Sequence, residues 1–192
     1  MKLLIINMYN DQEKYKRFEK KLMYALQGNK LIFKKWDDYK GIMDTLKNNK
    51  IAGIIISGSD YFVKGKRHSI VDEIIIKSKI PILAICYGFQ YIIAKFGNQS
   101  FIKTSASGYM KYTATFSITD ILHIPKNKYY LFHKDYIVKV PKSFKIIKKL
   151  KNKIIMAYNR KRNILGVQFH PEKYKKTSRQ FFNMWINKCV LF

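Results

Sequence analysis

Residues 81–96 read PILAICYGFQYIIAKF and constrain the fold more than any other stretch of this chain. The first part is a short apolar run after a proline, which is typical of a strand buried in a parallel sheet. The run continues without a linker into helical spacing, so Cys86 is predicted to lie on a sharp strand-to-helix turn. Gly88 allows that turn to be tight, and the positive end of the helix favours the thiolate form of Cys86. A lone cysteine is more often a small buried residue, so a chemical role depends on its neighbours.

Residues 164–172 (ILGVQFHPE) form the second informative stretch. Side chains two positions apart lie on the same side of an extended segment, so His170 and Glu172 can face the same way. The carboxylate can then hold the imidazole in one tautomer and stabilise its charged form. His-x-Glu alone is weak evidence, and a structural histidine explains it about equally well. Together with Cys86, these residues are the parts of a Cys-His-Glu nucleophilic triad.

Both stretches resemble motifs of the class I glutamine amidotransferases, and the resemblance covers nearly the whole chain. It implies that Cys86, His170 and Glu172 are catalytic and that no metal or organic cofactor is required. A third match is residues 54–60 (IIISGSD), where the family usually has a strand followed by Ser-Gly-Gly-Pro. The resemblance implies an oxyanion hole formed by the backbone amides of Ser59 and Tyr87.

Two positions depart from the family's pattern. Ala84 stands where the elbow usually has glycine, and Ser59 and Asp60 replace Gly-Pro. Ala84 adds only a methyl group, whereas Ser59 restricts a backbone that needs freedom to present its amide. These departures leave the expected fold unchanged. They keep open a catalytically weakened regulatory or nucleic-acid-binding module on the same scaffold.

Further matches concern glutamine binding. By resemblance, the loop glycine Gly58 and the elbow residue Gln90 belong to the substrate pocket. Ser107, Gly108 and Tyr109 match the family's segment whose backbone holds the glutamine substrate. The resemblance therefore implies a pocket for free glutamine beside the triad.

Residues 133–137 (HKDYI) look like the His-x-Asp motif of the GMP synthetase amidotransferases, and Tyr87 after the nucleophile fits the same branch. This likeness implies that His133 and Asp135 lie at the edge that faces a separate ATP-dependent synthetase chain. The structural alternative is that the two residues only cap a turn. The function implied is a glutaminase that delivers ammonia to a synthetase, with GMP synthetase as the first expectation. An anthranilate or aminodeoxychorismate synthase component and a γ-glutamyl hydrolase are the alternatives on this fold.

Length and cysteine content are typical of one domain in a reducing compartment. The 192 residues suffice for a single core, so residues 1–192 are expected to form one domain. Cys86 and Cys189 lie far apart, and no paired-cysteine metal spacing occurs. No apolar run reaches the length of a signal peptide or a membrane span, so we expect a cytoplasmic protein without membrane contact.

The chain is strongly basic, with 38 Lys and Arg against 12 Asp and Glu and a formal net charge of +26. The positive electrostatic potential of such a charge attracts polyanions whatever the fold of the protein. The excess is mainly lysine spread over the whole chain, and no recognition-helix, zinc-finger or aromatic RNA-binding motif accompanies it. Only weak, non-specific binding to nucleic acid is therefore expected.

The order of apolar segments predicts a three-layer α/β fold of the flavodoxin-like kind, with a mostly parallel central sheet, helices on both faces and an antiparallel edge. Besides the strand before Cys86, strands are expected at 2–7, 31–34, 51–57, 144–147, 154–158 and 164–169. Helices are expected at 11–26, 39–47, 69–78, 89–96 and about 177–188. Residues 99–140 contain short alternating segments, which predict antiparallel strands added to the sheet edge.

Overall fold

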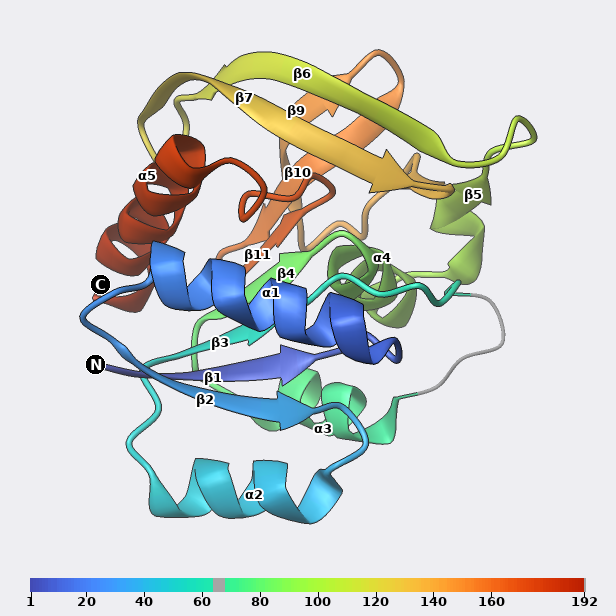
Figure 1. The fold of residues 1–192 in the computed structure, drawn as a ribbon. Helices are drawn as coiled ribbons and strands as arrows, with labels where there is room; N and C mark the ends of the chain where they lie inside the picture. The colour runs from blue at the N-terminus through green and yellow to red at the C-terminus, as the bar shows by residue number, and fades with distance from the viewer. Residues whose placement is uncertain (64–67, 192) are drawn as a thin grey trace.

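Four parallel strands made of continuous apolar runs form the centre of the fold (Figure 1). The computed structural model describes residues 1–63 and 68–191. The central strands, in their spatial order, are β1 (Lys2–Asn7), β3 (Gly53–Ile56), β4 (Ile82–Ile85) and β11 (Ile164–Val167). Almost all of their side chains are buried, because helices cover both faces of the sheet.

The sheet continues on both sides of this centre. Strand β2 (Lys30–Lys35) pairs in parallel with β1 and forms one edge. Beyond β11 the strands become antiparallel, in the order β10 (Lys153–Asn159), β8 (Asp135–Ile137) and β5 (Ile102–Thr104), and β9 (Lys145–Leu150) also pairs with β10. The predicted α/β architecture with a mixed, mostly parallel sheet is confirmed.

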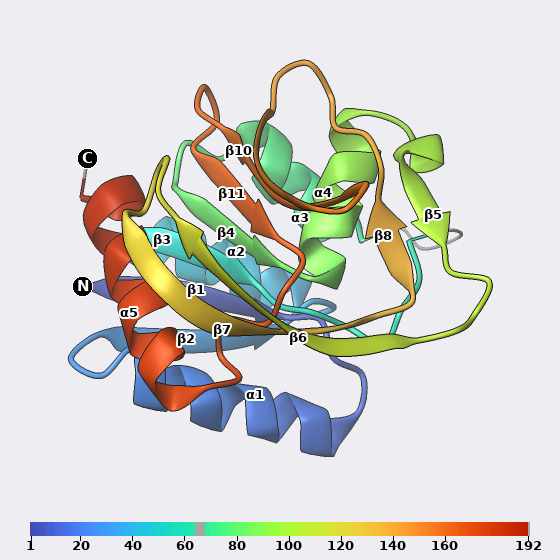
Figure 2. The ribbon, with the colours of Figure 1, turned by 90° about the horizontal axis from the view of Figure 1, so that it is seen from above.

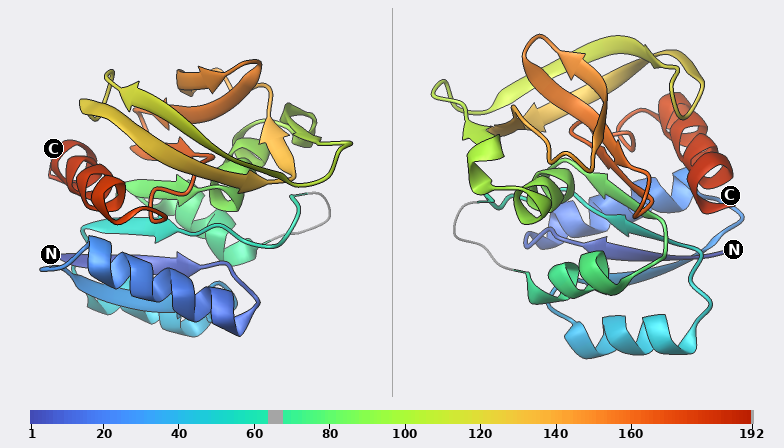
Figure 3. Two further views of the ribbon diagram at one scale, coloured as in Figure 1. Left: turned by 45° about the horizontal axis from the view of Figure 1, so that its top comes forward. Right: turned by 180° about the vertical axis from the view of Figure 1, so that it is seen from behind.

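The helices form two layers (Figures 1 and 3). One face of the sheet is covered by α1 (Gln12–Ala25) and α5 (Lys175–Trp185). The other face is covered by α2 (Tyr39–Asn48), α3 (Ser69–Lys77) and α4 (Tyr87–Phe96). A 3-10 turn follows α4 at Gln99–Phe101, and a π-helical turn at Ile186–Val190 ends the last helix. None of the helices in the described ranges is long and apolar enough to cross a membrane.

Strands β6 (Met110–Ile118) and β7 (Ile124–His133) form a separate two-stranded ribbon (Figure 2). The prediction that residues 99–140 extend the sheet edge holds for β5 and β8 and is wrong for this ribbon. The reason lies in its buried aromatic face, since Phe116 and Tyr129 pack on Phe169 with ring centroids 5.6 and 4.5 Å away. The ribbon therefore lies over the end of β11 and helps to bury the residues that follow this strand.

Two local features fix the helices nearest to the predicted site. The Asp11 side chain accepts a hydrogen bond of 2.8 Å from the amide of Lys14, which caps α1. Helix α4 lies against the sheet through Phe89, whose ring fills the space above Gly166. A methyl group on Gly166 would fall inside that ring, so the glycine is required for this close approach.

Candidate active site

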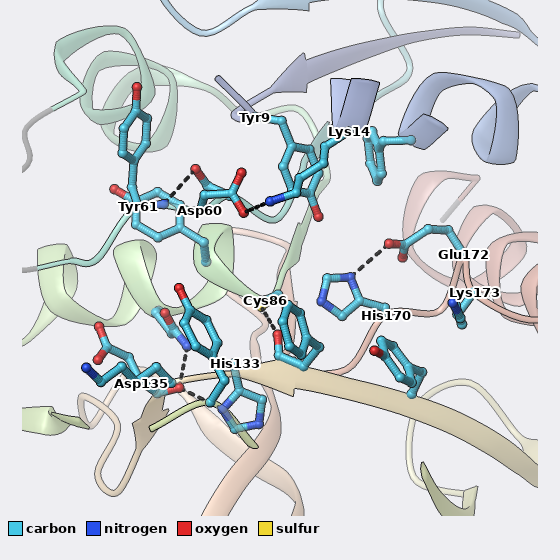
Figure 4. A pocket seen from close by; sticks show the side chains of 18 of the residues that line it. Tyr9, Lys14, Asp60, Tyr61, Cys86, His133, Asp135, His170, Glu172 and Lys173 are labelled. Carbon is cyan, nitrogen blue, oxygen red and sulfur yellow. Dashed lines mark hydrogen bonds and ion pairs between the residues drawn. The ribbon is translucent and has the colours of Figure 1, made fainter. Parts of the chain in front are cut away.

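The predicted site residues meet at the ends of the central strands, where α/β sheets bind ligands. Tyr9 follows β1, Gly58 follows β3, Cys86 follows β4 and His170 follows β11. Tyr9, Cys86 and His170 line one cavity of about 240 Å³, together with side chains from α1, α4 and the β7–β8 segment (Figure 4). Gly58 lies close to all three of these residues. The three members of the predicted triad all lie in the wall of this cavity.

Cys86 occupies a strained elbow between β4 and α4. Its backbone has φ 50° and ψ −106°, a conformation that non-glycine residues rarely adopt. The elbow is fixed on both sides, because the Cys86 amide donates to the Val167 carbonyl (2.7 Å) and the Cys86 carbonyl accepts from the Gln90 amide (3.1 Å). A Cβ on Gly88 would lie only 2.9 Å from the carbonyl oxygen of Ile56, which explains the glycine after the elbow.

His170 lies between Cys86 and Glu172 (Figure 4). Its Nδ1 atom donates a hydrogen bond of 2.8 Å to Oε1 of Glu172. The two side chains are only 11% and 3% exposed. The backbone of His170 is held by the ribbon, because its amide donates to the Tyr130 carbonyl at 2.8 Å. The opposite nitrogen of the ring, Nε2, is thereby left for Cys86.

The charges of His170 and Glu172 stabilise each other. Burial alone would lower the pKa of His170, but Glu172 and Cys86 outweigh it and raise this pKa well above its usual value. Burial would likewise raise the pKa of Glu172, whereas the charge and hydrogen bond of His170 lower it overall. The arrangement favours an imidazolium paired with a carboxylate, beside the Cys86 sulfur.

Gly58 brings its loop close to this centre. A Cβ on Gly58 would lie 2.9 Å from the hydroxyl oxygen of Tyr9, 3.2 Å from Cε1 of His170 and 3.5 Å from Cβ of Cys86. Ser59 follows and is held by its hydroxyl, which donates to the Met8 carbonyl at 2.8 Å. Ser59 is not among the positive-φ residues of the described chain, so its side chain causes no backbone strain there.

Tyr87 is the first residue of α4, so its backbone amide has no partner within the helix. This amide belongs to the residue directly after Cys86, next to the elbow. The Tyr87 side chain points away into the core, where it is 1% exposed. The positions of Ser59 and Tyr87 are thus compatible with the expected oxyanion hole, whose role stays a prediction.

A hydrogen-bonded row of side chains runs from Gln90 to the sulfur. The Gln90 Nε2 atom donates to the Asp135 carbonyl (2.7 Å) and to Oε1 of Gln168 (3.0 Å). The Nε2 atom of Gln168 lies 3.5 Å from the Cys86 sulfur. The motif comparison missed Gln168, although its position two residues before His170 on an extended segment places both on one side.

His133 and Asp135 are buried, at 4% and 5% exposed, in the cavity wall. They line the cavity and do not lie on the open surface, and their expected role toward a partner chain stays a prediction. The alternating pattern of β7 and β8 turns both side chains inward. His133 Nδ1 donates to the Asp135 carbonyl at 2.8 Å, and the Asp135 carboxylate accepts from the Thr104 hydroxyl at 2.7 Å. Burial lowers the pKa of His133 to about 4, so this ring is neutral at neutral pH.

Only part of the predicted glutamine-binding segment reaches the cavity. Tyr109 lines the cavity mouth, is 54% exposed and stacks on Phe132 with ring centroids 5.2 Å apart. Ser107 and Gly108 lie outside the cavity wall of the structure as described. Gly108 has φ +84°, which gives the turn before β6 its shape. The binding roles of Ser107, Gly108 and Tyr109 stay predictions.

Several cavity residues had no signal in the motif comparison. Lys14, Arg17 and Lys21 follow helical spacing on α1 and face the cavity, and Lys14 forms an ion pair of 2.8 Å with Asp60. Burial, and then the charges of Glu172, Cys86 and Asp60, raise the pKa of Tyr9 well above its usual value, so its hydroxyl stays protonated. Among residues 1–63 and 68–191, no group of three His, Cys, Asp or Glu side chains could hold a metal ion.

Comparison with known proteins gives a consistent result. The sequence model of the family described as "Glutamine amidotransferase class-I" matches residues 12–188. The chain is 31% identical over 157 residues to the GMP synthase (glutamine-hydrolysing) of Wigglesworthia glossinidia brevipalpis, covering 76% of this chain and 30% of the relative. It is 35% identical over 136 residues to the corresponding enzyme of Petrotoga mobilis, covering 67% and 26%. The chain thus spans less than a third of the length of these two curated relatives.

Solved structures share the fold. A protein of Thermoplasma acidophilum that is described as one subunit of a GMP synthase superposes with a TM-score of 0.76 at 20% identity, covering 100% of this chain and 94% of that chain. The glutaminase domain of Trypanosoma brucei CTPS with bound acivicin superposes with a TM-score of 0.68 at 12% identity, covering 98% and 94%. At these identities the likeness concerns the fold alone.

Proposed function

This chain belongs to the class I glutamine amidotransferase family, and we propose on that basis that it is a glutaminase that supplies ammonia to a synthetase. The observation that carries the proposal is the contact of Cys86, His170 and Glu172 in one cavity. A strained cysteine at a helix start and a charged, buried histidine are the parts that an acyl transfer through a thioester needs.

In the first half of the reaction, the Cys86 sulfur attacks the side-chain amide carbon of glutamine. The carbonyl oxygen becomes an oxyanion, for which we propose the backbone amides of Ser59 and Tyr87 as donors. The C–N bond then breaks, and His170, oriented by Glu172, gives its proton to the departing ammonia. A γ-glutamyl thioester on Cys86 remains.

In the second half, water attacks the thioester carbon and loses its proton to His170. The C–S bond breaks, glutamate leaves, and the thiolate of Cys86 and the imidazolium of His170 are restored. We propose that Gln168 supports the thiolate at both ends of the cycle, because its amide nitrogen lies 3.5 Å from the sulfur.

The proposed acceptor of the ammonia is GMP synthetase on a separate chain. Similarity to GMP synthases supports the acceptor, and the Thermoplasma acidophilum protein of about this length supports a separate chain. His133 and Asp135 are proposed to couple the two proteins indirectly. The route is the row from the Asp135 carbonyl through Gln90 and Gln168 to the Cys86 sulfur.

Labelling with an electrophilic glutamine analogue tests the nucleophile. We expect mass spectrometry to find one adduct, on Cys86, that glutamine prevents and that Cys86→Ala abolishes. Cys189 is a built-in control, because it is 2% exposed and burial raises the pKa of its thiol to about 11. Labelling of Cys189 alone, or labelling that glutamine does not prevent even with a synthetase present, would contradict a glutaminase.

Stimulation by a partner tests the coupling. Glutamine hydrolysis should be slow for the isolated chain and should rise when a GMP synthetase ATP-binding chain and its nucleotide substrates are added. The variant His133→Asn/Asp135→Asn should keep Cys86 labelling and lose the stimulation. Equal stimulation of variant and wild type would show that this segment has no coupling role. High activity of the wild type alone would favour a free-standing γ-glutamyl hydrolase.

A further inference from the structure

His68 lies at the start of α3, outside the cavity wall, and aromatic side chains surround its ring. It is 1% exposed, and its carbonyl accepts the Asp72 amide at 3.0 Å in the first turn of the helix. Its ring centroid lies 4.4 to 5.8 Å from those of four aromatic residues: Trp36, Tyr61, Tyr87 and Tyr91. One of these four, Tyr87, directly follows the nucleophile.

Hydrogen bonds tie this histidine to the first two turns of α4. The His68 Nε2 atom lies 2.8 Å from the Tyr87 hydroxyl oxygen. The His68 amide donates to the Tyr91 hydroxyl (2.9 Å), which in turn donates to the Asp72 carboxylate (2.8 Å). The same carboxylate pairs with Lys95 at 2.9 Å. Helices α3 and α4 are therefore joined at the end that carries the elbow.

The direction of the Tyr87 amide depends on the peptide bond between Cys86 and Tyr87. Cys86 holds that bond in a strained conformation, with φ 50° and ψ −106°, which relaxes unless its neighbours hold it. The buried Tyr87 ring is one such neighbour, because it anchors the residue that carries the amide. A hydroxyl fixed by His68 cannot swing without breaking a buried hydrogen bond.

We propose that His68 is a positioning residue for the oxyanion hole, because its bond to the Tyr87 hydroxyl fixes the direction of the Tyr87 backbone amide. This inference rests on the proposed glutaminase function. His68 lies outside the cavity wall, and its hydrogen bond reaches the site through Tyr87. Its effect should therefore appear in the transition state and not in glutamine binding.

The test is Tyr87→Phe, which removes the hydroxyl and keeps the ring. Loss of a whole oxyanion donor lowers kcat by roughly 10² to 10³, so a loosened donor should lower kcat by about 10-fold while KM changes little. Alkylation of Cys86 by iodoacetamide develops no oxyanion, so its rate should stay within about 2-fold of wild type. The matched control is Tyr129→Phe, which removes a buried hydroxyl without a hydrogen-bond partner among the described residues and should leave kcat unchanged.

A double-mutant cycle with His68→Ala identifies the bond as the cause. If both single variants act by breaking the same contact, the kcat of the double variant should equal that of the less active single variant. Additive losses, or full kcat in Tyr87→Phe beside an active wild type, would overturn the role of His68 and leave the glutaminase function intact. A wild type with no glutamine-protected labelling of Cys86 would overturn the function and the inference together.

Discussion

The Nδ1 atom of His170 donates to Oε1 of Glu172 at 2.8 Å, and this pair is the most deeply buried ionic contact described at the site. The carboxylate fixes the tautomer of the ring and stabilises its charged form. In the proposed reaction, Nε2 is therefore the nitrogen that would exchange a proton with the substrate and with water. The pair turns a histidine at a strand end into a directed acid and base.

Glu172→Gln should keep the shape of this pair and remove its charge. We expect kcat for glutamine hydrolysis to fall by roughly 10² to 10⁴, because a neutral amide no longer stabilises the imidazolium. Steady-state kinetics at neutral pH measures this loss. Glu13→Gln, which changes a side chain that is 87% exposed on α1, is the matched control and should keep full activity. An active Glu172→Gln would exclude the carboxylate from the mechanism.

His133 should make stability depend on pH in a narrow range. Its folded pKa of about 4 lies below the unfolded value of about 6.5, so the unfolded chain binds the additional proton in between. Above about pH 6.5, the neutral His133 contributes fully to the free energy of unfolding. This contribution falls by about 3 kcal/mol as the pH falls to about 4. Urea titrations at several pH values should show a smaller loss for His133→Asn than for wild type.

The control for this pH prediction is the exposed residue His123. It has φ 49°, a conformation that asparagine tolerates, so His123→Asn removes an exposed histidine without adding backbone strain. If His133→Asn and wild type lost stability equally over this range, burial of a neutral His133 would be the wrong explanation.

Gly58→Ala should damage catalysis more than stability. The new methyl group would meet the Tyr9 hydroxyl at 2.9 Å and the His170 ring at 3.2 Å, so the imidazole must move. We expect at least about a 10-fold loss of kcat, since displacements well below 1 Å already disturb reacting groups. Tyr9→Phe removes the hydroxyl that the new methyl group would meet. In the Tyr9→Phe background, Gly58→Ala should therefore lower kcat by a smaller factor than it does in wild type. No loss in Gly58→Ala would mean that the loop shifts freely.

Cys86→Gly and Cys86→Ala should reverse the usual order of stability. Glycine normally destabilises a folded protein by roughly 0.5–1 kcal/mol relative to alanine. At φ 50° and ψ −106° a side chain costs on the order of 1–3 kcal/mol, which glycine avoids. Thermal unfolding should therefore find Cys86→Gly at least as stable as Cys86→Ala, with both variants inactive. A clearly more stable alanine variant would show that the elbow is not strained.

Binding to nucleic acid should be governed by salt. A formal net charge of +26 without an RNA- or DNA-reading motif acts through the release of counterions. Affinity for any DNA or RNA should collapse between low and physiological salt, with little preference for sequence, in fluorescence anisotropy titrations. Glutamine hydrolysis should not change. Tight binding of one sequence at physiological salt would instead indicate a nucleic-acid-binding module.

The sequence was sufficient to predict the central sheet and the local segments that carry Cys86, His170 and Glu172, because these rest on local patterns, whereas the catalytic role of the three residues stays a prediction. The apolar runs around β1, β3 and β4 and the turn at Cys86 are readable from neighbouring residues. The separate ribbon of β6 and β7 could not be predicted in this way. An alternation of apolar and polar residues predicts that a segment is a strand, but it does not predict which sheet the strand joins. Burial of His133 likewise depends on that ribbon, and the contact of His68 with Tyr87 joins segments whose spacing carries no motif.

The packing of the Phe89 ring on Gly166 limits which substitutions this sequence can accept in evolution. Phe89 follows the nucleophile by three residues, and Gly166 precedes His170 by four, so one ring sets the spacing between the two motifs. Any larger residue at 166 collides with the ring, and a smaller residue at 89 leaves a cavity that costs roughly 3–5 kcal/mol. Each position is closed to substitution while the other stays as it is. The two positions are therefore expected to change together, so that a residue larger than glycine at 166 should occur only with a side chain smaller than phenylalanine at 89.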